Sequence, residues 1–292
     1  MKEALLYKKL DQNQVRCQTC SHFCLIKPQT RGLCGVRENQ KGKLYVLNYG
    51  KIIAQHIDPI EKKPLYHFLP GTYSYSIAAV GCNFACKNCQ NWDISQGPKS
   101  NQSIQGLETA PEKIIEAALK NNCPSISYTY TEPTIFLEFA LETMKLARPA
   151  DLKNVWVTNG FISPQALEKI TPYLDAANVD LKSFEDRFYR DYCQARLQPV
   201  LNTLKQIKKK NIWLEITTLI IPGLTDQEKN LEKIAGFIKK ELGPETPWHI
   251  SRFFPEISWQ LQHLPATPLE SMEKAYQIGK KAGLKNIHKG NI

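Results

Sequence analysis

The chain has 292 residues, of which 42% are hydrophobic and 23% charged, and its formal net charge is +10 at pH 7. This length suits one large domain or one with a small appendage, and the composition excludes a disordered or fibrous protein. No apolar run is long enough to span a membrane, and residues 1–7 lack the apolar core of a signal peptide, so we expect a cytoplasmic protein without a membrane partner. The lysines form short runs such as Lys208–Lys210, typical of solvated helix faces, so we do not expect nucleic acid as a partner.

The N-terminal part carries a cluster of four cysteines within eighteen residues: Cys17, Cys20, Cys24 and Cys34. Nine cysteines in a reducing compartment indicate metal binding or catalysis rather than disulfides. Four thiolates suit a structural zinc ion or a closed iron–sulfur cluster, and we favour zinc slightly. A metal would stabilise a segment that is too short to bury much apolar surface.

Two further features lie before residue 71. Residues 43–57 alternate in hydrophobicity around Asn48-Tyr49-Gly50 and predict a β-hairpin. A polar segment bounded by proline, residues 58–64, reads as a connector. We therefore expect two parts: an N-terminal four-cysteine segment over residues 1–70 and a larger domain over residues 71–292.

A second group of thiols, Cys82, Cys86 and Cys89, has the spacing C-x3-C-x2-C and directly follows an apolar run, Tyr73 to Val80. Three thiolates do not complete a tetrahedral structural zinc site. They suit a cluster of four irons in which one iron keeps an open position, and an open position on a metal is where chemistry takes place.

From residue 71 onward, apolar strand patterns alternate with helical ones. Residues 73–80, 125–129, 154–158, 177–181, 212–221 and 248–253 are expected strands, and a last one begins at residue 287. Helices are expected between them, with capping boxes at Thr109, Thr225 and Thr267 and a start at Ser163-Pro164. Repeated alternation of this kind predicts an α/β fold with parallel strands covered by helices.

When parallel strands covered by helices close into a barrel, the active site lies at the carboxyl ends of the strands. Polar residues stand at these ends: the three cysteines after the first strand, then Glu132, Thr158 with Asn159, Asp180 with Lys182, and His249 with Arg252 on the sixth strand. Strand alternation places Asp180 and Lys182 on one side and Leu181 on the other. The remaining cysteines, Cys123 and Cys193, have no neighbouring ligands in the sequence and are expected to be packing residues.

The order of these motifs resembles the radical S-adenosylmethionine (SAM) superfamily, in particular the enzymes related to pyruvate formate-lyase activating enzyme. The motifs that match are Thr158-Asn159-Gly160, Asp180-Leu181-Lys182 and residues 222–226. The resemblance is closer to the group called the AmmeMemoRadiSam system radical SAM enzyme, through the four-cysteine segment, residues 58–68, 89–92, 130–133 and 248–253. Two departures stand out: Asn88 replaces an aromatic residue before the third cysteine, and Glu132 is not preceded by two glycines.

This resemblance implies a partial (β/α)6 barrel that binds a 4Fe-4S cluster at Cys82, Cys86 and Cys89 together with SAM. It implies that an electron, from a donor such as flavodoxin or ferredoxin, splits SAM into methionine and a 5′-deoxyadenosyl radical, which takes hydrogen from an unidentified substrate, possibly a protein. The residues expected to contact SAM are Glu132, Thr158, Asn159, Asp180, Lys182 and His249. For Glu132 the alternative is a carboxylate at a helix N-terminus, for Asp180 and Lys182 a salt bridge at the rim, and for His249 a packed core residue.

Two other functions stay open. One is an activase that removes hydrogen from a glycine of a partner enzyme, as the pyruvate formate-lyase activating enzymes do. The other is a metal-bearing module that binds nucleic acid or protein, with the four-cysteine segment as its working part. The three-cysteine loop favours an enzyme, because a binding module has no need for an iron with an open position.

Overall fold

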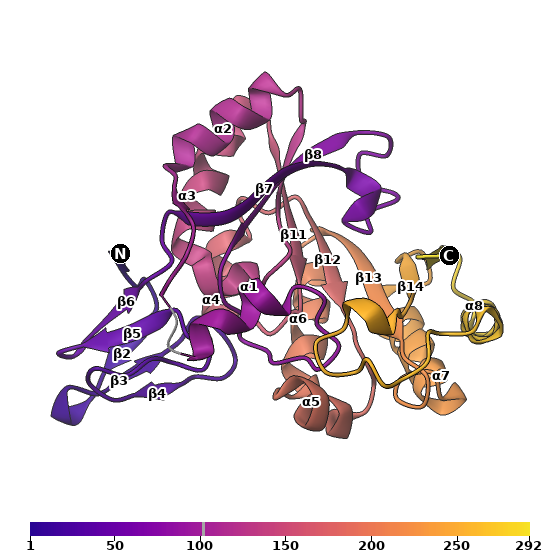
Figure 1. Cartoon of the computed structure of the whole chain (residues 1–292). Coiled ribbons are helices and arrows are strands. Elements are labelled where there is room, and N and C mark those ends of the chain that lie inside the picture. The colour runs from indigo at the N-terminus through magenta and orange to yellow at the C-terminus, as the bar shows by residue number, and fades with distance from the viewer. Residues whose placement is uncertain (101–102) are drawn as a thin grey trace. The chain divides into compact units, whose positions relative to one another are not determined.

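The computed structural model describes residues 1–100 and 103–292 (Figure 1). By compactness these residues form two units, one made of residues 1–83 and 91–177 and the other of residues 84–90 and 178–292. The boundary expected near residue 70 is not where this division falls, and it stays a prediction. None of the helices in the described ranges is long and apolar enough to cross a membrane.

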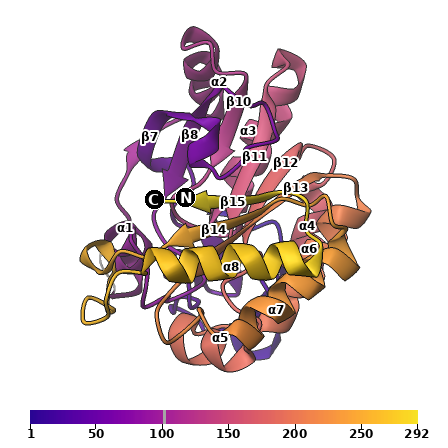
Figure 2. The ribbon, with the colours of Figure 1, turned by 90° about the vertical axis from the view of Figure 1, so that its right-hand side faces the viewer.

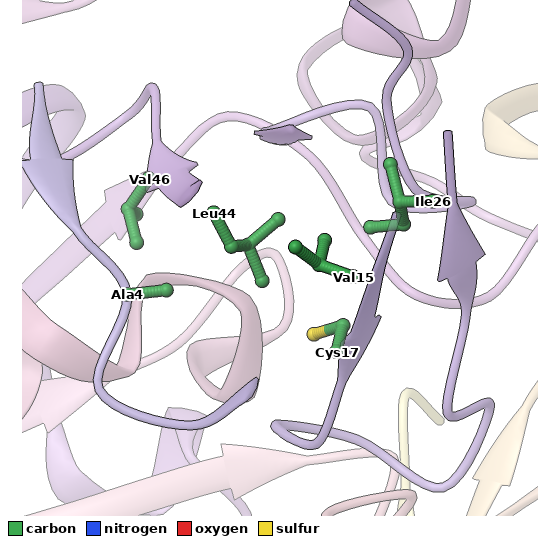
Figure 3. Close-up of a cluster of buried hydrophobic side chains, with 6 residues drawn as sticks. All are labelled: Ala4, Val15, Cys17, Ile26, Leu44 and Val46. Carbon is green, nitrogen blue, oxygen red and sulfur yellow. The ribbon is translucent and has the colours of Figure 1, made fainter. Parts of the chain in front are cut away.

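Two small antiparallel sheets begin the first unit. One has the order β1 (Lys2–Glu3), β6 (Lys43–Val46) and β5 (Arg37–Gln40), and the other the order β2 (Tyr7–Lys9), β3 (Val15–Cys17) and β4 (Leu25–Ile26). They share one apolar cluster, which Figure 3 shows: Ala4, Val15, Cys17, Ile26, Leu44 and Val46. Because side chains alternate along a strand, Val15 and Cys17 lie on the same face of β3, and the exposed Arg16 lies on the other.

The expected hairpin over residues 43–57 is wrong. Strand β6 pairs with β5 and β1, whereas β7 (Lys51–Pro59) pairs with β8 (Tyr73–Ala79) and with the short β9 (Leu107–Glu108). The turn at Asn48-Tyr49-Gly50 therefore carries the chain from one sheet to another. Local alternation predicted both strands but not their partners, which are distant in sequence.

The main sheet of the first unit has the strand order β11 (Lys153–Thr158), β10 (Ser125–Tyr128), β8, β7 and β9. Strands β8, β10 and β11 are parallel, as expected, and β7 runs antiparallel to β8. The helices α2 (Pro111–Lys120) and α3 (Leu137–Ala147) pack against each other and contact β8 and β11 respectively (Figure 1). The unit also contains α1 (Trp92–Gln96) and α4 (Pro164–Ile170).

In the second unit the order is β15 (Ile287–Gly290), β14 (Trp248–Arg252), β13 (Trp213–Ile220) and the end of β12 (Ala176–Asp180). Strands β13, β14 and β15 are parallel, which confirms the expected last strand. The helices are α5 (Asp186–Cys193), α6 (Leu197–Lys209), α7 (Glu228–Phe237) and α8 (Leu269–Ala282). Figure 2 shows α7 and α8 side by side, and α8 also contacts β14 and β15. Helix α5, like α1 of the first unit, has no counterpart among the expected helices.

The helices begin close to the expected residues, but most of the expected capping hydrogen bonds are not formed. Ser163 does cap α4, since its hydroxyl accepts the N–H of Ala166 at 3.1 Å. The three expected capping boxes are wrong, because each threonine hydroxyl donates to a backbone carbonyl instead: Thr109 to Leu107 at 3.1 Å, Thr225 to Leu219 at 2.7 Å and Thr267 to Ile220 at 2.5 Å. The last two bonds fix the loops before α7 and α8 to the end of β13.

Candidate metal centres

The four N-terminal cysteines come together around one pocket. Cys17 ends β3, Cys24 directly precedes β4, and Cys20 and Cys34 lie in the connecting turns. All four line the pocket with other residues of the first unit: Thr19, His22, Ile26, Gly32, Leu33, Arg37, Asn83 and Ile135. Within residues 1–100 and 103–292, no three His, Cys, Asp or Glu side chains stand in preformed metal-ligand geometry.

Backbone amides already point at the sulfur atoms of this pocket. The N–H groups of His22, Leu33 and Val36 donate to the sulfurs of Cys20, Cys24 and Cys34 respectively. Burial nevertheless raises the pKa of Cys20 and of Cys34, and it raises the pKa of Cys24 to about 11. Burial therefore disfavours the charged form of Cys20, Cys24 and Cys34, and a metal ion would displace the protons of these thiols on binding.

Two nitrogen atoms at the pocket have no partner among the described residues. Arg37 is buried, with 2% of its surface exposed, and both terminal nitrogens of its guanidinium bond Glu138, at 3.0 and 2.6 Å, while its Nε lacks a partner. Asn83 is 3% exposed, and its Nδ2 lacks a partner as well. Buried donors are normally hydrogen-bonded, so both atoms call for an acceptor that the protein itself does not supply.

The first cysteine of the second group lies at the end of the first unit. Cys82 follows β8, and the side-chain amide of Asn159 lies 3.9 Å from its sulfur and donates to Oδ1 of Asn83 at 2.7 Å. His22 Nε2 donates to the backbone carbonyl of Asn83 at 2.8 Å. One residue, Asn83, thus contacts a residue of the four-cysteine pocket and one of the expected SAM-binding residues.

The other two cysteines of the group lie in the segment of residues 84–90, which belongs to the second unit. The N–H of Ala85 donates to the carbonyl of Cys193 at 3.0 Å, and that of Lys87 to the carbonyl of Tyr192 at 2.9 Å. The carbonyl of Cys89 accepts the N–H of Trp259 at 3.1 Å. The end of α5 and the loop before α8 therefore hold the backbone on which Cys86 and Cys89 stand.

Cys193 is buried, as expected for a packing residue, but sequence reasoning missed its contact with Cys86. Its thiol makes a hydrogen bond with that of Cys86, and this bond together with burial raises the pKa of Cys86, against the opposing charge of Lys182. Cys193 is fully buried, but it is a neighbour of a candidate ligand rather than an isolated packing residue. Nothing in the sequence could indicate this contact, because 107 residues separate the two thiols.

Covalent geometry alone limits how far apart the three loop cysteines can lie. Four residues of extended chain span at most roughly 14 Å between the Cα atoms of Cys82 and Cys86, and Cys89 follows three residues later. Three soft thiolates on so short a loop fit an iron–sulfur cluster. Asn88, which stands where relatives of the expected family carry an aromatic residue, keeps its Oδ1 buried without a partner among the described residues.

Glu132 is buried at the start of the short helix Pro133–Phe136, with 1% of its surface exposed. Its carboxylate accepts the backbone N–H and the hydroxyl of Thr134, at 3.0 and 2.5 Å. It also accepts the hydroxyl of Thr158 at 2.7 Å and the N–H of Asn159 at 2.8 Å. Burial raises the pKa of Glu132, and these bonds act against that shift. The structure thus brings Glu132, Thr158 and Asn159 together, with the carboxylate fixing the turn after β11.

Asp180 and Lys182 lie at the end of β12 and form an ion pair of 2.7 Å. Leu181 is fully buried between them, as strand alternation requires. The Lys182 side chain is 15% exposed; burial lowers its pKa, but Asp180, Cys86 and Cys193 outweigh that effect and raise it. Lys182 therefore places a positive charge close to Cys86, and Asp180 offsets part of its effect.

His249, on β14, is buried and paired. Its Nε2 lies 2.6 Å from Oε2 of Glu215, which is also fully buried, and its ring stacks on that of His288 at 5.1 Å. Glu215 accepts a second bond from the indole of Trp213 at 3.0 Å. Arg252, three residues along the strand, donates to the carbonyl of Thr267 at 2.7 Å. These contacts are those of a packed, satisfied core histidine.

Known proteins show the same fold and the same family. A family model described as the radical SAM superfamily matches residues 76–235, which is more than half of the chain. An uncharacterized protein of Methanocaldococcus jannaschii is 47% identical over 292 residues, covering 100% of this chain and 86% of that protein. Pyruvate formate-lyase-activating enzyme of Clostridium pasteurianum is 22% identical over 165 residues, covering 54% of this chain and 66% of that enzyme.

Solved structures agree. A radical SAM methyltransferase from Sphaerobacter thermophilus matches with a TM-score of 0.56 and 12% identity, covering 75% of this chain and 67% of that one. SuiB of Streptococcus suis bound to S-adenosylmethionine matches with a TM-score of 0.57 and 11% identity, covering 75% and 52%. The expected radical SAM fold is confirmed, and with it a 4Fe-4S cluster and SAM are implied as cofactors. The chain belongs to the radical SAM superfamily of enzymes.

Proposed function

We propose that this protein cleaves SAM reductively and passes the resulting radical to a substrate. The observation that carries the proposal is the loop of Cys82, Cys86 and Cys89 directly after β8, in a chain of this family. A 4Fe-4S cluster bound there would supply one electron, received from a flavodoxin or ferredoxin, to break the S–C5′ bond of SAM. The products are methionine and a 5′-deoxyadenosyl radical, which takes a hydrogen atom from the substrate and leaves as 5′-deoxyadenosine.

The chain's own residues divide into two groups with respect to SAM. Asp180 and Lys182 are partly exposed, and we assign them to SAM binding, with Lys182 also balancing the thiolate charge of Cys86. We assign Thr158 and Asn159 to SAM binding as well, through the turn that the carboxylate of Glu132 holds. Both carboxylate oxygens of Glu132 accept hydrogen bonds from residues of the first unit, and His249 pairs with Glu215. We therefore assign Glu132 and His249 to positioning other residues rather than to direct contact with SAM.

The substrate class has one specific indication. The relatives include the activating enzyme of Clostridium pasteurianum and, at 25% identity over 114 residues, the (2S)-3-sulfopropanediol dehydratase activating enzyme of Klebsiella oxytoca. The second candidate function is therefore activation of a glycyl-radical partner enzyme. The matched portions cover 54% and 38% of this chain, so a small-molecule substrate stays an equal proposal.

For the N-terminal pocket we propose a tetrathiolate metal site, and zinc in preference to a second cluster. The four cysteines share one small pocket, and the spacing of Cys17 and Cys20 is typical of zinc ligands. Amides two residues after Cys20 and Cys34 donate to their sulfurs, which stabilises thiolate charge. The role is structural, because four protein ligands leave no open position on the ion.

The decisive experiment is the measurement of 5′-deoxyadenosine. The protein is reconstituted with iron and sulfide without oxygen, reduced with dithionite and incubated with SAM, together with the variants Cys86→Ala and Cys123→Ala. Cys123 is a buried thiol outside both groups, so its variant controls for loss of a cysteine as such. Nucleoside is expected from the native chain and from Cys123→Ala, and none from Cys86→Ala.

Two results would contradict the proposal. A native chain that holds four irons in the loop and still leaves SAM intact is not a SAM-cleaving enzyme. A colourless chain that takes up zinc but no iron would favour the binding module, in which the four-cysteine segment is the working part.

A further inference from the structure

The four-cysteine pocket contains more buried hydrogen-bond donors than the described residues have acceptors for. Four thiolates and one divalent zinc carry a net charge of about −2. Arg37, the buried cation at the pocket, is already neutralised by Glu138 through two bonds. A buried anion of this kind is stable only if hydrogen-bond donors surround it. The pocket has three backbone donors on its sulfurs and, in Arg37 Nε and Asn83 Nδ2, two side-chain donors without an acceptor.

Asn83 is also fixed from two other sides. Its Oδ1 accepts the amide of Asn159 at 2.7 Å, and its backbone carbonyl accepts Nε2 of His22 at 2.8 Å. It is 3% exposed and covalently follows Cys82. A force on the Asn83 side chain is therefore transmitted to a ligand of the radical SAM loop on one side and to the turn of Thr158 and Asn159 on the other. Interiors this tightly packed transmit small shifts rather than absorb them.

We propose that zinc bound by Cys17, Cys20, Cys24 and Cys34 accepts N–H···S hydrogen bonds from Arg37 Nε and Asn83 Nδ2, and that Asn83 thereby makes the radical SAM loop sensitive to whether the pocket holds its metal. The coupling rests on the proposed cluster at Cys82, Cys86 and Cys89, whereas the two hydrogen bonds do not. Loss of the metal from the pocket then shifts Cys82 through its neighbour Asn83.

The hydrogen bonds are tested by zinc affinity, without iron, SAM or turnover. Asn83→Asp keeps the acceptor for Asn159 and replaces the donor by an oxygen that repels thiolate. Arg37→Lys keeps a cation beside Glu138 and removes Nε. The matched controls are Asn121→Asp, at the exposed end of α2, and Arg187→Lys, in an exposed ion pair with Asp191 outside the pocket lining. Zinc transfer to a colorimetric chelator is measured for each.

Loss of a hydrogen-bond partner of a metal ligand typically weakens metal binding by about 10–100-fold, and we expect this range for Asn83→Asp and Arg37→Lys. The controls are expected to bind as the native chain does. Circular dichroism at saturating zinc identifies any variant that fails to fold. If Asn83→Asp or Arg37→Lys fails to fold, the zinc affinity of the other variant tests the hydrogen bonds. Native affinity in both variants would overturn the hydrogen bonds. Iron with sulfide in the pocket, lost on Cys20→Ser, would overturn the assignment of zinc.

The coupling is tested by electron paramagnetic resonance of the reduced cluster, with and without SAM, in the native chain, Cys20→Ser and Cys123→Ser. Cys20→Ser removes a pocket ligand and leaves the loop untouched, so a changed spectrum is expected from this variant alone. An unchanged spectrum in zinc-free Cys20→Ser would overturn the coupling. If the native chain forms no cluster, the proposed function fails instead, while the zinc measurement still decides on the pocket.

Discussion

The side-chain amide of Asn159 donates a hydrogen bond of 2.7 Å to Oδ1 of Asn83, although 76 residues separate them in sequence. The same amide lies 3.9 Å from the sulfur of Cys82, and the Oδ1 of Asn159 accepts the N–H of Phe161 at 2.9 Å. One side chain thus holds the turn after β11 and the beginning of the three-cysteine loop.

Asn159→Asp is expected to separate these two functions. The carboxylate can still accept from Phe161 but has no donor for Asn83, whose buried oxygen then faces another oxygen. We expect a loss of about 1–3 kcal/mol in the free energy of unfolding, the usual cost of an unsatisfied buried group, measured by urea denaturation. Asn121→Asp, on the surface, is expected to change it by less than about 0.5 kcal/mol. Equal stabilities for the two variants would contradict the role of this bond.

A second prediction concerns the buried pair of Asp58 and Lys63. Nζ of Lys63 lies 2.6 Å from Oδ2 of Asp58, Lys62 bonds the other oxygen at 2.7 Å, and the hydroxyl of Tyr130 donates to Oδ2. Burial acts to raise the pKa of Asp58, but these three donors outweigh it and the pKa lies below its ordinary value. Burial lowers the pKa of Lys63 despite Asp58. Removing the carboxylate therefore leaves a buried lysine without its counter-charge.

Asp58→Asn is expected to cost about 3–5 kcal/mol at pH 7. The depressed pKa of Asp58 means that its contribution is complete above the unfolded pKa of roughly 3.9 and is lost as the pH falls below that value. The native chain should therefore lose stability between about pH 5 and pH 2 more steeply than the variant does, as measured by thermal unfolding at a series of pH values. Asp151→Asn, at an exposed position, is the control. Parallel acid limbs in native chain and variant would refute the prediction.

The third prediction concerns Cys193, which makes a hydrogen bond with the thiol of Cys86. In the cluster-loaded protein its S–H would donate to a ligand sulfur and stabilise the more negative, reduced cluster. Cys193→Ala is expected to lower the reduction potential by roughly 60 mV, the one-electron equivalent of about 1.4 kcal/mol, a size typical of one hydrogen bond. Redox titration followed by electron paramagnetic resonance measures it. Cys123→Ala should leave the potential unchanged, and a shift of the same size there would argue against a specific contact.

A fourth prediction compares two residues that look alike in sequence. Ser163 and Thr109 both precede a proline near a helix start, but only Ser163 accepts a helix amide. Ser163→Ala should cost about 1 kcal/mol in the free energy of unfolding, and Thr109→Ala much less. Urea denaturation of both variants checks this, and a larger loss for Thr109→Ala would contradict the assigned caps.

These two residues also mark how far the sequence determines the fold. Hydrophobic periodicity located β8, β11 and the last strand because it reflects burial along one segment. The hydroxyls of Thr225 and Thr267 were assigned wrongly because their acceptors, the carbonyls of Leu219 and Ile220, become available only once β13 is in place. Helix α5 was missed because it has only eight residues and its buried face, Phe188, Tyr189 and Cys193, is aromatic and short rather than an aliphatic repeat over several turns.

The candidate site, too, could be predicted from the sequence only in part. The ligand cysteines could be predicted because their spacing is local, and the chemistry of three or four thiolates follows from their number. The surroundings of those thiols could not. Arg37 reaches Glu138, Asn83 reaches Asn159 and Cys193 reaches Cys86 only in the tertiary structure, because the members of each pair are far apart in the sequence.

The backbone bonds of residues 84–90 have a consequence for how this protein is made. The residues lining the four-cysteine pocket end at Ile135, but Arg37 bonds Glu138 and Cys20 bridges Ile162, so the surroundings of the pocket are complete only once that part of the chain has been made. The segment that bears Cys86 and Cys89 takes backbone partners from later in the chain, among them Tyr192, Cys193, Trp259 and Gln260. In order of synthesis, we therefore expect the surroundings of the pocket to form before the segment of Cys86 and Cys89 is held in place.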